Sequence, residues 1–268
     1  MIKNKKGFSL LEQSLTITII SILMSGAVIY ADKSYDQNQY NETIKRIRDI
    51  ENAIISYFIH ENQSDFYTGF LCPSSPEDDL SNPEFGKEIR GISCSTKNGI
   101  VKKGEYFLGA VPVRTIEIAD YYMFDGWGNR FSFIINPKFI FSDEGETSTF
   151  ASKFSDLNWL TENKLYYIIS HGPNGKGAYN QYGFKNSISK NLAEENNSIF
   201  SKKTLNITDY SMTEEFDDVV VSKSALEFFR NISGGVLLSK SFCKIITIGS
   251  ENNYNCSLLR SKVKKLCV

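Results

Sequence analysis

Between Phe8 and Tyr30 the chain is mostly apolar, and Glu12 is the single charged residue of this run. An α-helix rises about 1.5 Å per residue, so a run of this length can cross a hydrocarbon core of about 30 Å. Three lysines precede the run and none lies within it. Because positive charge favours the cytoplasmic side of a membrane, the pattern predicts a cytoplasmic N-terminus and a body on the other side.

A secretory signal peptide would also begin with positive charge followed by an apolar stretch. Three features argue against that alternative. The apolar run is too long for a signal peptide, it carries a carboxylate near its start, and no small-x-small cleavage site closes it. We therefore predict a retained transmembrane helix.

Helical spacing of apolar residues continues beyond this run. The residues that recur at steps of three and four are Ile44, Ile47, Ile50, Ile54 and Phe58. Charged residues stand between them, and the first proline is Pro73. We predict one nearly continuous helix, transmembrane over residues 8–30 and an amphipathic stem over residues 31–62. Gly26 is its weak point, where local bending or melting is expected, because glycine costs about 1 kcal/mol relative to alanine inside a helix.

Residues 63–268 are predicted to form a globular domain with inserted loops. Turn-forming residues appear there, and short runs rich in aromatic and β-branched residues indicate strands. These runs are residues 106–113, 131–135, 165–169, 219–221 and 244–248. The expected fold class is α+β, with an antiparallel sheet packed on the apolar stripe of the stem. Residues 180–210 look like an exposed insertion, and the C-terminal tail has the pattern of a short amphipathic helix.

Composition excludes some classes of protein. Thirty Lys and Arg against thirty-one Asp and Glu give a net charge of -1, so no global field would attract nucleic acid. The five cysteines form no CxxC pair and there are only two histidines, so a structural zinc site is not expected. The cysteines are Cys72, Cys94, Cys243, Cys256 and Cys267.

Outside the cytoplasm, closeness in sequence favours a disulfide between Cys72 and Cys94 and another between Cys243 and Cys256. Cys267 would then be left over. In a reducing compartment the same cysteines would instead be small buried hydrophobic residues.

Glu12 requires an explanation, because a carboxylate inside an apolar segment costs several kcal/mol, about 3 on insertion scales, unless it is paired or near the interface. One alternative is that its side chain reaches the headgroup region, since it lies near the start of the run. Intramembrane ionisable residues are more often functional.

The residues Lys5-Lys6-Gly7-Phe8-Ser9-Leu10-Leu11-Glu12 resemble the prepilin processing motif of type IV pilins and type II secretion pseudopilins. By this resemblance a prepilin peptidase would cut after Gly7 and methylate the new amino group of Phe8. Glu12 would pair with the N-terminal ammonium of a neighbouring subunit and act in assembly. Type IV pilins commonly carry a proline inside the apolar helix, and this chain has none there.

Two further motifs resemble those of major pseudopilins. Residues 125–133, Asp-Gly-Trp-Gly-Asn-Arg-Phe-Ser-Phe, resemble their D-x-W-G-N-x-aromatic hairpin, and residues 169–175 resemble the S-x-G-x-D/N-G turn that follows it. A pilin-like fold follows from the resemblance. Trp127 is expected to be a core anchor whose indole N–H is satisfied by the backbone.

Pseudopilins of this branch bind calcium in a C-terminal loop. Asp217 and Asp218, with acidic residues nearby, are weak calcium candidates, and a solvated acidic loop is the preferred interpretation. No other cofactor is expected. His171 adjoins Ser170 in a turn and no nucleophile elbow is present, so an enzyme, such as a membrane-tethered periplasmic one, is disfavoured.

The resulting hypothesis is a pseudopilin or minor pilin, anchored by a single pass in the bacterial inner membrane with its domain in the periplasm. The implied partners are the prepilin peptidase, other pilin or pseudopilin subunits and an inner-membrane assembly platform, and nucleic acid is not among them. The enlarged domain favours a minor or specialised subunit. The alternative is a filament-tip binding module that recognises a secreted protein, DNA or a surface.

Overall fold

The computed structural model describes residues 10–61, 70–90, 94–103, 106–136, 162–188, 195, 197–198 and 217–233. Within these ranges a long N-terminal helix packs on a five-stranded antiparallel sheet, which is an α+β fold. The elements are α1 (Leu10–Glu61), β1 (Val101–Lys103), β2 (Tyr106–Ala110), η1 (Asp120–Met123), β3 (Ser132–Ile135), β4 (Lys164–Ser170), β5 (Val219–Ser224) and α5 (Ala225–Ser233).

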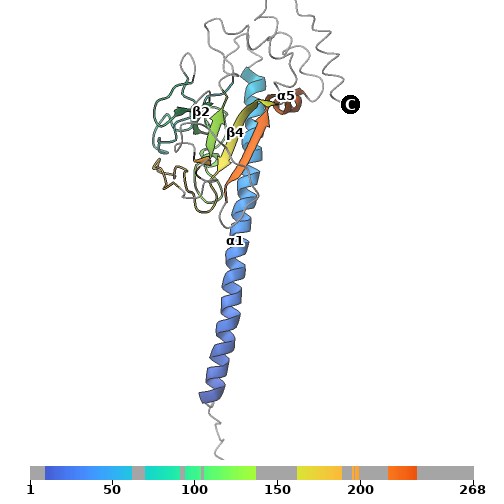
Figure 1. The fold of residues 1–268 in the computed structure, drawn as a ribbon, viewed down its shortest axis with the longest axis vertical. Coiled ribbons are helices and arrows are strands. Elements are labelled where there is room, and N and C mark those ends of the chain that lie inside the picture. The colour runs from blue at the N-terminus through green and yellow to red at the C-terminus, as the bar shows by residue number, and fades with distance from the viewer. Residues whose placement is uncertain are drawn as a thin grey trace, which may run out of the picture.

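The helix α1 has 52 residues, which corresponds to about 78 Å at 1.5 Å per residue. Its N-terminal half extends away from the rest of the protein, and its C-terminal half lies along the sheet (Figure 1). The helix contains no proline, and it continues through Gly26 without a break. The predicted continuity of the helix is confirmed over the described residues.

The sheet is a simple meander in the order β1-β2-β3-β4-β5, with every neighbouring pair antiparallel. Strands β2 to β5 overlap four of the five predicted strands, and the fifth, residues 244–248, lies outside the described residues. Strand β2 ends at Ala110, earlier than predicted, because Pro112 has no N–H for a ladder and its carbonyl begins a turn to Ile116.

Strand β1 and helix α5 were not predicted from the sequence. Strand β1 has only three residues, two of them lysine, which hides it from a hydrophobic pattern. Helix α5 begins with a capping box: the Ser224 hydroxyl accepts from the Glu227 N–H at 3.2 Å, and the Glu227 carboxylate accepts from the Ser224 N–H at 2.7 Å. The Ser-x-x-Glu pattern was therefore a usable signal for this helix.

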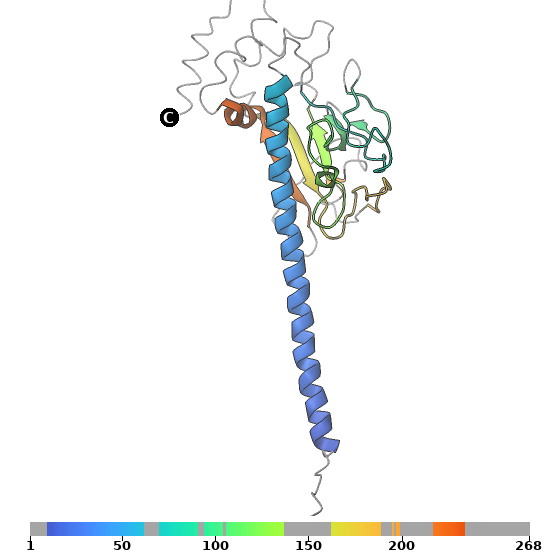
Figure 2. The same cartoon turned by 180° about the vertical axis from the view of Figure 1, so that it is seen from behind.

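The core lies between α1 and the sheet. The stem residues Ile47, Ile50, Ile54 and Phe58 are each at most 7% exposed, as the spacing predicts. They belong to one hydrophobic cluster with residues of β3 and β4. Seen from behind, the C-terminal half of α1 lies in front of part of the sheet (Figure 2). A smaller cluster, formed by Leu108, Ile134 and Ile169, belongs to the opposite face of the sheet.

A disulfide joins Cys72 to Cys94, with 5.4 Å between the two Cα atoms. It ties the start of the segment that follows α1 to the residues just before β1. Cys243, Cys256 and Cys267 lie outside the described residues, as does the C-terminal tail.

Candidate functional site

The N-terminal half of α1 presents large apolar side chains to the outside. From Leu10 to Val28 these side chains are between 49% and 87% exposed. An 18-residue window of this helix has a mean hydropathy of 1.9, and none of it is buried. Within the described residues, α1 is the one helix that is long and apolar enough to cross a membrane.

Hydroxyl groups within this apolar half bond to the backbone of their own helix. Thr16 donates to the Glu12 carbonyl at 2.7 Å, Thr18 to the Ser14 carbonyl at 2.8 Å, and Ser25 to the Ser21 carbonyl at 2.8 Å. Serine and threonine can in this way satisfy their polar groups without water or a partner helix. The polar residues of this half are therefore compatible with an apolar surrounding.

Glu12 lies in the first turn of α1 and is exposed. A carboxylate at this position interacts favourably with the positive end of the helix dipole. Gly7 and Phe8, the predicted processing residues, lie outside the described residues.

The described residues that follow α1, from residue 70 onward, are called the head. The turn at residues 125–129 attaches the head to the stem. The Gly126 N–H donates to the Thr43 hydroxyl at 2.8 Å, and Arg46 Nη1 donates to the Asp125 carbonyl at 3.0 Å. A Cβ added at Gly126 would lie 2.1 Å from the Gln39 carbonyl oxygen. Only glycine therefore allows this close approach of the turn to α1.

Asp125 organises the turn from its buried side chain. Its Oδ1 accepts from the N–H groups of Trp127 and Asn129, at 3.0 and 2.9 Å, and its Oδ2 accepts from the Ser170 hydroxyl at 2.7 Å. Burial raises the pKa of Asp125 to about 6, although these hydrogen bonds and the charge of Arg46 act in the opposite direction. The turn is thus joined to the end of β4.

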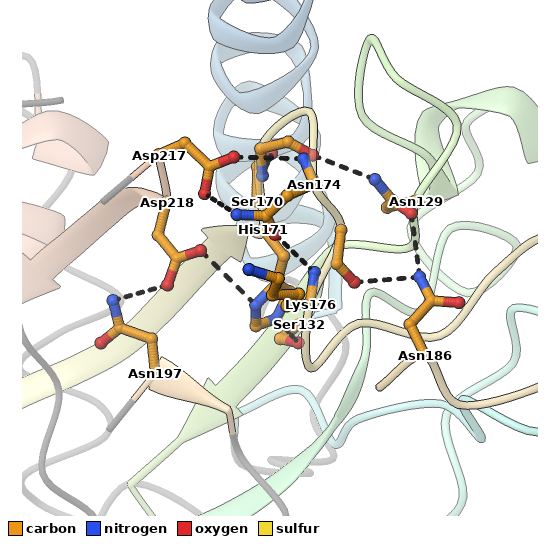
Figure 3. Close-up of polar contacts among 12 residues, drawn as sticks. Asn129, Ser132, Ser170, His171, Asn174, Lys176, Asn186, Asn197, Asp217 and Asp218 are labelled. Carbon is orange, nitrogen blue, oxygen red and sulfur yellow. Dashed lines mark hydrogen bonds and ion pairs between the residues drawn. The ribbon is translucent and has the colours of Figure 1, made fainter. Parts of the chain in front are cut away.

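A polar cluster lies where the turn after β4 meets the start of β5 (Figure 3). Asn174 donates to Asp217 twice, from its side-chain amide at 2.7 Å and from its backbone N–H at 3.1 Å. Asn197 donates to Asp218 Oδ2 at 2.9 Å. Both carboxylates are at most 8% exposed. The expectation of a solvated acidic loop is therefore wrong for these two residues, because other segments of the chain cover them.

The two carboxylates point to different partners, Asp217 to Asn174 and Asp218 to Asn197 and His171 (Figure 3). Amide groups of Asn174 and Asn197 donate hydrogen bonds to these carboxylates, whereas calcium requires converging oxygen ligands. Among the described residues there is no group of three or more His, Cys, Asp or Glu side chains that could hold a metal ion. Asp209, Glu214 and Glu215, the acidic residues near this pair, lie outside the described residues.

His171 lies between Ser132 and Asp218, an arrangement that the sequence analysis did not foresee. The Ser132 hydroxyl is 2.8 Å from His171 Nε2, and His171 Nδ1 is 3.8 Å from Asp218 Oδ1. The order of groups is that of a Ser-His-Asp triad. However, the three residues are 5%, 0% and 2% exposed, and the second distance is longer than a hydrogen bond. These groups are buried contacts between β3, the residue that follows β4 and the residue that precedes β5.

Asn129 and Asn186 extend the cluster to the loop beyond residue 180. Asn129 donates to the Gly172 carbonyl at 3.1 Å, and Asn186 donates to Asn129 Oδ1 at 3.2 Å and to the Gly175 carbonyl at 2.9 Å. The two motifs at residues 125–133 and 169–175 are thus in direct contact. These hydrogen bonds connect the turn that contacts the stem to the loop after residue 180.

Trp127 differs from its prediction. It is only partly buried, it belongs to neither core cluster, and its indole N–H has no hydrogen-bond partner among the described residues. The backbone N–H of Trp127 is used by Asp125, so the residue fixes the turn through its main chain. The prediction of a core anchor satisfied by the backbone is wrong.

Comparisons of the chain with protein-family models, with curated proteins and with solved structures find no match.

Proposed function

We propose that this chain is a structural subunit of a pilus-like filament, a pseudopilin or minor pilin of a type II secretion or type IV pilus-like system. Its partners are a prepilin peptidase, other subunits and an inner-membrane assembly platform. The support comes from the processing motif at residues 5–12 together with the division of α1 into two halves.

The observation that carries the proposal is this division. One unbroken helix presents exposed apolar side chains up to Val28 and buries Ile47, Ile50 and Ile54 against the sheet further along. A free apolar half of this length must lie in a bilayer or against other helices, because water would oppose its exposure. A filament subunit needs both arrangements, the first before assembly and the second after it.

Glu12 fits this cycle chemically. In the precursor its carboxylate stands near one end of the apolar run, at the edge of a membrane. After cleavage behind Gly7, the new ammonium group of Phe8 in a neighbouring copy would neutralise it. Such a pair adds little net stability in an apolar interior, but leaving either charge alone there is costly, so pairing selects the correct register.

The disulfide between Cys72 and Cys94 supports a head outside the cytoplasm, since disulfides persist in oxidising compartments. The proposed topology is a single pass with the N-terminus in the cytoplasm and the head in the periplasm. The lysines before Phe8 favour the same orientation.

The proposal is tested by mass spectrometry of the chain purified from membranes of cells that contain a prepilin peptidase. We expect a mature N-terminus at Phe8 with a methylated amino group. A Gly7→Val variant is the control and should stay uncleaved, because a side chain there obstructs an extended backbone in a protease cleft. Retention of Met1 in the working protein, or cleavage near Ala31, would overturn the proposal.

A further inference from the structure

The hairpin at residues 179–185 carries two exposed aromatic side chains. Tyr179 pairs with Lys185 across it, and the Asn180 side chain accepts from the N–H groups of Tyr182 and Phe184, at 2.9 and 3.1 Å. Tyr182 is 64% exposed and Phe184 is 70% exposed. Tyr182 and Phe184 are called the aromatic tip.

A buried arginine fixes the backbone of the aromatic tip. The Arg130 guanidinium donates to the carbonyls of Asn180, Gln181 and Pro76, at 2.8, 3.0 and 3.0 Å, and Arg130 is 1% exposed. Gly183 lies against the Glu77 carbonyl, where an added Cβ would be 2.1 Å from the oxygen. Exposed aromatic residues on a backbone already held in place are typical of protein-binding sites, since little ordering is needed on binding.

An acidic residue borders the aromatic tip. The Glu77 backbone lies against Gly183 of the hairpin, while its exposed side chain lies beside Gly99 and has no hydrogen bond or ion pair within the described part of the chain. Its neighbour Asp79 is engaged with the N–H groups of Ser81 and Asn82. Lys185 lies on the other flank. A partner that contacts the Glu77 side of the tip must therefore offer positive charge.

The charged residues of the stem fall into two groups. Three carboxylates have partners within the chain: Glu42 pairs with Arg46, Asp49 accepts from the Tyr122 hydroxyl, and Glu51 contacts Tyr166 and Lys223. Lys45 and Arg48 are exposed, with no hydrogen bond or ion pair among the described residues. Lys45, Arg48, Asn52 and Ser56 follow one another at steps of three and four, so they lie on one face of α1. This row is called the outer stem face.

The aromatic tip and the outer stem face cannot meet within one copy. In both ribbon views, the segment that follows β4 lies on the side of the head away from α1 (Figure 1, Figure 2). Two complementary surfaces on different sides of a subunit give a head-to-tail contact, which produces rings or open helical filaments.

We propose that the aromatic tip of one copy packs on the outer stem face of the next, with Arg48 and Lys45 against the rings of Tyr182 and Phe184 and beside Glu77. Cationic side chains over aromatic faces, together with an ion pair at the rim, give this contact its direction. The inference rests on the proposed filament function and names the contact between heads and stems. A membrane surface fits less well, because anionic lipid repels Glu77.

A charge exchange in the full chain tests the contact, with assembled protein measured by crosslinking in cells and by filament yield. Lys45→Glu with Arg48→Glu places negative charge against Glu77 and should raise the concentration needed for assembly about tenfold. Adding Glu77→Lys to that variant should bring it back to within about threefold of the wild type. Lys102→Glu on β1 is the matched control and should assemble normally, and unchanged melting temperatures show that the variants fold.

Normal assembly by the Lys45→Glu and Arg48→Glu variant would overturn the contact while leaving the filament function intact. A wild-type chain that never assembles would overturn both.

A photoreactive phenylalanine at position 182 gives an independent readout. It should crosslink to a peptide that contains Lys45 and Arg48 from a second copy. Crosslinks exclusively to lipid, or to a different protein, would overturn the contact in favour of a membrane or a tip-binding role.

Discussion

The Gly126 N–H donates to the Thr43 hydroxyl of α1 at 2.8 Å, and together with the hydrogen bond from Arg46 to the Asp125 carbonyl it fixes the position of this turn along the stem. Gly126 and Thr43 are both next to Gln39, whose carbonyl leaves no room for a side chain on Gly126. In a filament, such a fixed attachment would transmit the register of the helices to the heads.

Gly126→Ala should lower the free energy of unfolding by about 3 kcal/mol, because the new methyl group collides with the α1 backbone rather than with a mobile side chain. Urea unfolding of the full chain in detergent measures the change. Gly26→Ala is the matched control. Nothing lies within 4 Å of its added Cβ, so it should stabilise the helix by about 1 kcal/mol. An undamaged Gly126→Ala protein would show that the turn does not dock on the stem as described.

Glu12→Ala should leave cleavage largely intact but reduce incorporation into filaments more than about tenfold, because a neighbouring ammonium group would remain unneutralised in an apolar interior. Glu12→Gln keeps a polar side chain but removes the charge, and it should reduce incorporation into filaments to a similar extent. The comparison is the yield of assembled protein against Gln13→Ala, which should assemble normally. Normal assembly by the Glu12→Ala protein would refute the role of this carboxylate.

Asp217→Ala should lower the unfolding free energy by about 1.5 kcal/mol, because two hydrogen bonds to a carboxylate are lost while the exposed Asn174 can bond to water instead. A calcium chelator should leave the melting temperature of the wild type unchanged, since the Asp217 carboxylate accepts hydrogen bonds from Asn174. Asp36→Ala on the exposed part of α1 is the control and should change stability by less than about 0.5 kcal/mol. A chelator-induced drop would show that this region does hold a cation.

Local patterns were sufficient to predict α1 and four strands, because a stripe such as Ile47, Ile50 and Ile54 records which side of a helix is buried. The polar cluster was missed for a physical reason. Asp217 and Asn174 are 43 residues apart, so the burial of Asp217 depends on how β5 pairs with β4 and not on its own neighbours in sequence. The sequence around Asp217 is acidic, which is why a solvated loop was preferred.

Contacts between segments that are distant in sequence also explain why the environments of Trp127 and Arg130 were not predicted. Its residue type alone favours a core position for Trp127. The turn is instead held by the buried Asp125 carboxylate, which accepts from the main-chain N–H groups of Trp127 and Asn129. Arg130, an apparently ordinary surface residue, is instead buried by carbonyl groups from two separate loops. Neither outcome follows from local hydrophobicity.

Asp125 predicts a specific dependence of stability on pH. Burial raises its pKa to about 6, compared with 3.8 for an ordinary aspartate. Because the folded state then binds the proton more tightly than the unfolded chain, the stabilisation from protonation is complete below about pH 4 and is lost as pH rises through about 6. Near neutral pH, keeping the ionised carboxylate buried costs about 3 kcal/mol relative to acid conditions.

Asp125→Asn removes this titration while keeping an oxygen that can accept from the Trp127 and Asn129 N–H groups. The difference in unfolding free energy between variant and wild type should therefore shift in favour of the variant by about 3 kcal/mol between pH 4 and pH 7. Urea titrations at both pH values measure it, and Asp36→Asn should show no such shift. A difference that stays constant with pH would mean that the Asp125 carboxylate titrates as an ordinary aspartate does.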